Sequence, residues 1–202
     1  MQRRYALKSI ARYTLAATTV AIFSSCTQSK PQFSSIDLTG ADYARDFRLT
    51  DHHGQPRSLK DFQGKVVVLF FGYTQCPDVC PTTMAELAQT KKLLGADGDK
   101  LQVLFVTVDP ERDTPAVLKA YMANFEPSFL ALRGSPEQLA AMARDFKVYY
   151  KKTDGKTPTS YGMDHSAASY VYDTQGRLRL YTRYGSGAQA LASDIQLLLK
   201  AG

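Results

Sequence analysis

The sequence lacks a long hydrophobic run, internal repeats and, beyond its first residues, any large net charge. Its N-terminal apolar stretch, Leu15 to Phe23, has nine residues and is too short to cross a bilayer as a helix. Residues 1–25 hold four basic and no acidic residues, so the rest of the chain carries 21 basic and 19 acidic residues, a net charge of +2. Nucleic-acid binding therefore loses most of its electrostatic support.

Residues 1–25 are typical of an export signal, with a basic start followed by a short apolar core. Two serines directly precede Cys26, which resembles a bacterial lipoprotein signal in which the cysteine is acylated, although Phe23 stands where leucine is usual. Simple cleavage, a retained anchor and a twin-arginine signal are the alternatives. We predict lipidation at Cys26 and a place at the periplasmic face of the bacterial cytoplasmic membrane, lipid-anchored or held by an uncleaved N-terminal segment.

The rest of the chain divides into a tether and one domain. Residues 26–40 are rich in Ser, Thr, Gln and Pro without apolar periodicity, which predicts a tether, and residues 41–202 form the domain. Phe47–Thr50 and Gln55–Ser58 predict a short hairpin whose turn contains the solvated residues His52 and His53.

Buried strands and amphipathic helices alternate along the domain. Strands are predicted at Lys65–Gly72, Leu101–Val108, Ala167–Asp173 and Leu178–Tyr184, and helices are predicted to begin at Pro81, Thr114-Pro115 and Ser135-Pro136 and to end the chain around Leu191–Leu199. This order predicts an α/β, thioredoxin-like fold with an extra N-terminal hairpin and an insertion, Tyr149 to Asp164, before the third core strand.

Apart from Cys26, the chain has two cysteines, Cys76 and Cys80, which lie between the first buried strand and a helix. Open α/β sheets bind ligands at this edge, and a helix start favours thiolate over thiol. Four-residue spacing places both thiols on one face. In an oxidising compartment such a pair forms a disulfide, binds a metal or alternates between the two. The alternative is that the two cysteines are buried and inert, or form a plain structural disulfide.

Two thiolates hold a soft ion such as copper(I), but a site for both copper oxidation states needs a harder ligand. His165 is the best candidate, because it lies just before the third core strand in a loop expected to face the cysteines. Zinc also suits a cysteine-cysteine-histidine set, but no general base stands out for zinc hydrolysis. Nearby, Asp109 and Arg112 are predicted to form a salt bridge beside a helix cap at Thr114.

Three motifs resemble those of the SCO/SenC family: GYTQCPDVCP at residues 72–81, DPERDTP at 109–115 and DHS at 164–166. The resemblance implies a thioredoxin-like copper protein that helps to build the dinuclear copper centre of cytochrome c oxidase. It implies copper ligation, as Cu(I) or Cu(II), by Cys76, Cys80 and His165, with Asp78 tuning the site or the docking surface. The expected partners are the copper-accepting oxidase subunit and a thiol reductant or copper donor protein, with no nucleic acid.

Two functional hypotheses use the same residues. The first is a copper metallochaperone, and the second is a thiol-disulfide oxidoreductase of the cell envelope, in which Cys76 and Cys80 alternate between dithiol and disulfide. A thiol peroxidase is disfavoured, because Tyr73 stands where peroxiredoxins have threonine, three residues before the reactive cysteine.

Overall fold

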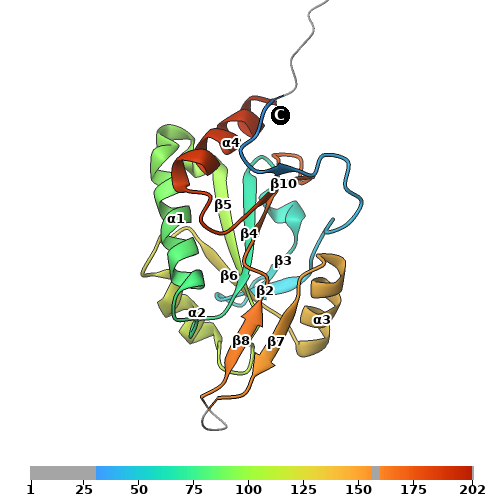
Figure 1. The fold of residues 1–202 in the computed structure, drawn as a ribbon, viewed down its shortest axis with the longest axis vertical. Coiled ribbons are helices and arrows are strands. Elements are labelled where there is room, and N and C mark those ends of the chain that lie inside the picture. Colours follow the sequence, from blue (N-terminus) through green and yellow to red (C-terminus); the bar gives the residue numbers. More distant parts are fainter. Residues whose placement is uncertain (1–30, 156–159, 202) are drawn as a thin grey trace, which may run out of the picture. The chain divides into compact units, whose positions relative to one another are not determined.

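The computed structural model describes residues 31–155 and 160–201, so the predicted signal segment and Cys26 lie outside the described residues. An eight-stranded mixed sheet runs through the domain in the order β1-β10-β9-β4-β5-β6-β2-β3, and β7 and β8 form a second, two-stranded sheet (Figure 1). Among the described residues, no helix combines the length and the apolar character needed to cross a membrane.

The strands of the main sheet are β1 (Ile36–Asp37), β2 (Leu49–Asp51), β3 (Pro56–Arg57), β4 (Val66–Gly72), β5 (Leu101–Thr107), β6 (Leu130–Arg133), β9 (Ser169–Tyr172) and β10 (Leu178–Thr182). The helices are α1 (Val79–Leu93), α2 (Pro115–Met122), α3 (Pro136–Asp145) and α4 (Ala188–Ala201), with short 3-10 helices at Leu59–Phe62 and Gly95–Lys100. The second sheet consists of β7 (Tyr150–Thr153) and β8 (Gly162–His165).

The predicted central strand is confirmed. β4 is parallel to β5 on one side and antiparallel to β9 on the other, and every residue of β4 and β5 is buried. Helices α1 and α4 pack together at this sheet (Figure 1). Because both faces of β4 are covered, its sequence is continuously apolar instead of alternating, whereas β5 also buries Gln102 and Thr107. With the β9–β10 hairpin beside the parallel strands, this is the predicted thioredoxin-like order.

Within the core, one strand and the start of one helix differ from the sequence-based expectation. Strand β6, which is parallel to β5 and antiparallel to β2, was not predicted; it has only four residues, too few to show a period. Helix α1 begins at Val79, two residues before Pro81. The first-turn amides of a helix have no intrahelical acceptor, so a proline costs no hydrogen bond there.

The start of the domain is held by a buried carboxylate. Asp194 of α4 accepts the backbone N–H groups of Ser34 and Ser35, at 2.8 and 2.9 Å, and β1 then pairs with β10. The Ser35 hydroxyl also lies 2.8 Å from that of Thr182. Residues 34–37, within the predicted tether, therefore lie on the domain.

The predicted insertion is an antiparallel hairpin, which we call the β7–β8 arm. Its register pairs Tyr150 with His165 and Thr153 with Gly162. The arm carries His165 as the last residue of β8, so this histidine stands at a strand end and not in a loop. The Ser166 N–H donates to the Tyr149 carbonyl at 2.9 Å, which closes the base of the arm.

The prediction that His52 is solvated is wrong. The residue is only 8% exposed, and its ring Nδ1 accepts the Ala131 backbone N–H at 3.0 Å. The His52 backbone N–H donates to the Ala131 carbonyl at 2.9 Å. The turn after β2 is thus attached to β6. Burial lowers the pKa of His52 below its usual value, because a charged imidazole loses solvation there. His53 is exposed, as predicted.

Acid should destabilise the fold through His52. Its folded pKa is lowered, so below about pH 6.5 the unfolded chain binds more protons than the folded one, and the free energy of unfolding falls by up to about 1.4 kcal/mol per pH unit. Urea unfolding at pH 7.5 and 5.5 should show a smaller pH effect in His52→Asn, whose amide oxygen accepts the same bond, than in the wild type. His53→Asn removes a neighbouring charge that also lowers the pKa of His52, so it should reduce the pH effect only in part; equal pH effects in all three proteins would contradict this origin.

Candidate metal centre

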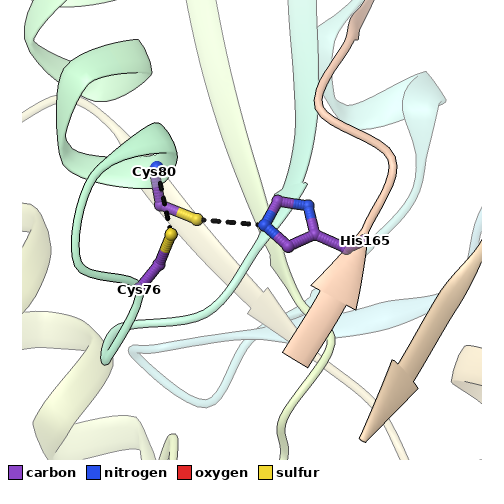
Figure 2. Close-up of side chains that lie close together, drawn as sticks. All are labelled: Cys76, Cys80 and His165. Atoms are coloured by element: carbon purple, nitrogen blue, oxygen red, sulfur yellow. Dashed lines mark hydrogen bonds between the residues drawn. The ribbon is translucent and has the colours of Figure 1, made fainter. Parts of the chain in front are cut away.

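The fold brings the three predicted ligand residues together. Cys76 lies in the loop after β4, Cys80 in the first turn of α1, and His165 at the end of β8 (Figure 2). Their sulfur and nitrogen donor atoms all lie within 4.8 Å of one another. The closest approach between cysteine and histidine joins Cys80 Sγ to His165 Nε2 at 3.4 Å, across 85 positions of sequence.

The two thiols differ in their surroundings. Cys80 is 0% exposed, whereas Cys76 is half-buried and its sulfur accepts the Cys80 N–H at 3.4 Å. Burial raises the pKa of Cys80, so the thiolate that the helix start was expected to favour is opposed by desolvation, and Cys80 is a thiol at neutral pH. Both cysteines are free in this structure.

The imidazole of His165 presents an unprotonated nitrogen to the cysteines. Its Nδ1 lies 3.0 Å from the Ser166 carbonyl oxygen, which can only accept a hydrogen bond, so Nδ1 carries the proton. Burial lowers the pKa of His165, and the neutral ring keeps its lone pair on Nε2. The rings of Tyr73 and Phe70 stand edge-on to it, each with its centroid 5.9 Å away.

Gly72, the last residue of β4, gives the Cys80 sulfur its space. A Cβ atom at this position would lie 2.9 Å from Cys80 Sγ, 2.9 Å from the Phe70 ring and 2.8 Å from the Phe105 ring. This glycine begins the motif at residues 72–81, but a role for it was not predicted. The signal was a glycine ending an otherwise apolar buried strand, which often marks a close approach.

Replacing Gly72 with alanine should weaken both folding and copper binding. The new methyl group meets rigid core atoms on three sides, so we expect a loss of about 1–3 kcal/mol in unfolding free energy and a displaced Cys80 sulfur. Urea denaturation and Cu(I) competition titration measure the two effects. Gly176→Ala is the control: it strains a turn with a φ of 74° and should lower stability without changing copper affinity. Unaltered copper affinity in Gly72→Ala would refute the steric argument.

The remaining predicted residues surround this group. Asp78 is exposed at the N-terminal boundary of α1, where its carboxylate accepts the Thr82 hydroxyl at 3.3 Å. The predicted Asp109–Arg112 salt bridge is present. Thr114 caps α2 as predicted, since its side chain accepts the Val117 N–H.

Fold and side chains together define a thioredoxin-like α/β protein with a dithiol and an imidazole gathered at the carboxyl end of its sheet. The sequence matches SCO1/SenC over residues 37–200, and the chain belongs to this family.

Three relatives illustrate the similarity. "Protein SCO2 homolog, mitochondrial" of Mus musculus is 39% identical over 153 residues, which cover 75% of this chain and 60% of the mouse protein. The structure of Bradyrhizobium japonicum ScoI with copper bound is 38% identical, with a TM-score of 0.70 over 76% of this chain and 97% of that chain. A SCO1/SenC family lipoprotein from Bacillus anthracis is 27% identical, with a TM-score of 0.65 over 76% of this chain and 92% of that one.

Proposed function

We propose that this protein binds copper through Cys76, Cys80 and His165 and delivers it to the copper-accepting subunit of cytochrome c oxidase. The observation that carries the proposal is the convergence of two sulfurs and one unprotonated nitrogen within 4.8 Å. Two soft thiolates suit copper(I), and the imidazole adds a ligand that copper(II) also accepts. The copper-bound Bradyrhizobium relative supports this choice of metal.

Cys80, His165 and Cys76 have different roles in binding and releasing the ion. Cys80 must lose its proton to bind, so copper uptake releases at least that proton and is favoured by higher pH. The Ser166 carbonyl holds His165 in the tautomer that binds through Nε2. Cys76 is half-buried in a loop while Cys80 is fully buried, so an acceptor thiol would reach the metal from the Cys76 side.

Attachment at the membrane belongs to the same proposal. Acylation of Cys26 and a tether that ends before Phe33, which packs against the core, would hold the site near an oxidase at the periplasmic face of the cytoplasmic membrane. The lipoprotein from Bacillus anthracis supports a lipid anchor. A copper donor protein and a thiol reductant would load and reset the site.

Thiol-disulfide exchange without metal transfer is the second candidate. It is favoured by the two free cysteines, whose sulfurs lie within 4.8 Å of each other beside a helix start. In this role the pair would reduce the cysteines of the acceptor through a mixed disulfide and would become a disulfide itself.

Removing the imidazole should separate the two candidates. Loss of a residue that only contacts a metal ligand costs up to about 100-fold in metal affinity. In reduced His165→Ala, which loses a ligand itself, we expect copper(II) affinity to fall by more than about 100-fold. Copper(I) affinity should fall less, because both thiolates remain, and exchange with oxidised glutathione should stay close to the wild-type rate.

His53→Ala serves as the control, since it removes an exposed imidazole. Competition titrations with both copper oxidation states, alongside exchange kinetics, give the readout. Wild-type copper(II) affinity in His165→Ala would reject His165 as a ligand. A wild-type protein that exchanges thiols but binds no copper would favour the second candidate.

A further inference from the structure

The β7–β8 arm that carries His165 needs contacts to hold it in place. The arm forms its own two-stranded sheet and is not a member of the eight-stranded sheet. A two-stranded hairpin alone is marginally stable. The position of the His165 ring relative to the cysteines therefore depends on what ties the arm to the body of the domain.

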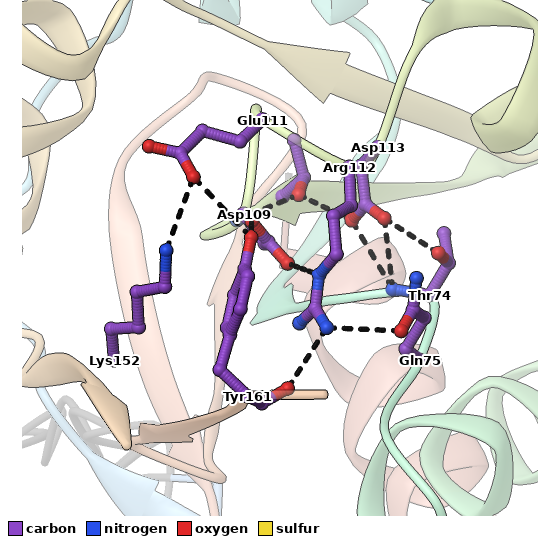
Figure 3. Close-up of polar contacts among 9 residues, drawn as sticks. Thr74, Gln75, Asp109, Glu111, Arg112, Asp113, Lys152 and Tyr161 are labelled. Atoms are coloured by element: carbon purple, nitrogen blue, oxygen red, sulfur yellow. Dashed lines mark hydrogen bonds and ion pairs between the residues drawn. The ribbon is translucent and has the colours of Figure 1, made fainter. Parts of the chain in front are cut away.

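Arg112 joins the arm to the body of the domain. Its side chain is only 15% exposed, and its Nη1 donates to the Tyr161 carbonyl of the arm at 2.8 Å and to Gln75 Oε1 of the cysteine loop at 2.9 Å (Figure 3). The guanidinium carbon lies 3.5 Å from the centroid of the Tyr161 ring and 5.9 Å from that of Tyr73, the residue that packs edge-on against His165. One planar cation thus contacts both segments that carry the candidate metal ligands, the cysteine loop and the β7–β8 arm.

Two buried carboxylates bind the same loop to both segments. Arg112 Nε donates to Asp109, a buried carboxylate that also accepts the Tyr161 hydroxyl at 2.8 Å. On the other side, buried Asp113 accepts the Thr74 N–H at 3.1 Å and the Thr74 hydroxyl at 2.5 Å. The loop after β5 is therefore bound to the arm through Asp109 and to the cysteine loop through Asp113 (Figure 3).

We propose that Arg112 is a positioning residue for the copper site: by joining the cysteine loop to the β7–β8 arm, it holds His165 Nε2 opposite the paired sulfurs. This inference rests on the proposed function, because it assigns the residue that sets the geometry of that site. The guanidinium binds three acceptors at once. Nη1 donates to the Tyr161 carbonyl and to Gln75 Oε1, while Nε donates to Asp109. A lysine has one ammonium on a flexible stem and cannot reproduce this arrangement.

The test is a double-mutant cycle of Arg112→Lys with His165→Ala, measured as copper(II) affinity. The lysine keeps a positive charge beside buried Asp109. In the His165 background, Arg112→Lys should lower copper(II) affinity by about 10- to 100-fold. In the His165→Ala background it should change affinity by less than about twofold, because the residue through which it acts is gone.

Lys151→Gln is the matched control. Lys151 is an exposed residue of β7, in the same arm, and removing an exposed charge should alter affinity by less than about threefold in either background. Gln75→Ala is the second variant, should Arg112→Lys fail to fold. It removes only the cysteine-loop end of the tie and should cost about fivefold with His165 present and nothing without it.

A metal-free measurement keeps this inference separate from the proposed function. In copper-free Arg112→Lys, the NMR signals of the His165 ring should shift and broaden as its contact with Cys80 is lost, while those of Lys151→Gln should match the wild type. Equal affinity losses in both backgrounds, or an unchanged His165 ring in Arg112→Lys, would overturn the positioning role. An unchanged affinity in His165→Ala alone would instead count against the proposed ligand set.

Discussion

Replacing Cys80 with serine should lower copper(I) affinity by more than about 100-fold, which exceeds the cost of losing a residue that only contacts a ligand. The substitution keeps nearly the same shape but replaces a soft, ionisable sulfur with a hydroxyl that binds copper(I) poorly. Cys80 is fully buried and lies 3.4 Å from His165 Nε2, and within residues 31–155 and 160–201 the one other thiol is that of Cys76, itself a proposed ligand. Competition with a chromogenic copper(I) chelator measures the loss.

Thr83→Ser is the matched control for this variant. Thr83 is buried in the same helix, and its hydroxyl donates to the Val79 carbonyl at 2.8 Å; serine keeps that bond and should retain wild-type affinity. Circular dichroism checks that both variants fold. A folded Cys80→Ser protein with undiminished copper(I) affinity would disprove the proposed ligand set.

Oxidising the reduced protein should expel copper. A disulfide between Cys76 and Cys80 removes two protons and two electrons from the thiols, passes the electrons to an added oxidant such as oxidised glutathione, and removes both soft ligands. The sulfurs lie within 4.8 Å of each other, and bonding requires about 2.05 Å, so a movement of the half-buried Cys76 loop suffices. We expect the affinity for copper(I) to fall by more than about 100-fold, since only His165 remains as a ligand.

Cys76→Ser gives the comparison for the redox experiment, because it cannot form the internal disulfide. The copper(I) affinity of this variant should be lower than that of the wild type and the same before and after mild oxidation. The copper(I) affinity of the wild type should fall on oxidation and recover on reduction. Mass spectrometry of alkylated protein confirms the thiol state. If the fully oxidised wild type keeps its copper with equal affinity, the coupling of redox state to metal release is wrong.

Local sequence patterns predicted most of the fold because they report local physics. The continuous apolar run of β4 requires cover on both faces, and the Thr-Pro and Ser-Pro pairs before α2 and α3 act as helix caps within one turn of chain. The pattern failed at β6, whose four residues are too short for any period. It also failed at His52, because its burial comes from Ala131, which is distant in sequence.

By itself, the sequence determined which atoms are available: two thiols one helical turn apart at a helix start, and a histidine beside a core strand. Only the tertiary structure decided that the His165 ring meets Cys80, that Gly72 leaves room for the sulfur, and that Arg112 joins the two segments. It also reversed the expected acidity of Cys80, whose pKa is raised by burial. The reason is physical: caps and strand patterns depend on neighbours along the chain, whereas desolvation, close approach and ligand distance depend on segments that meet only after folding.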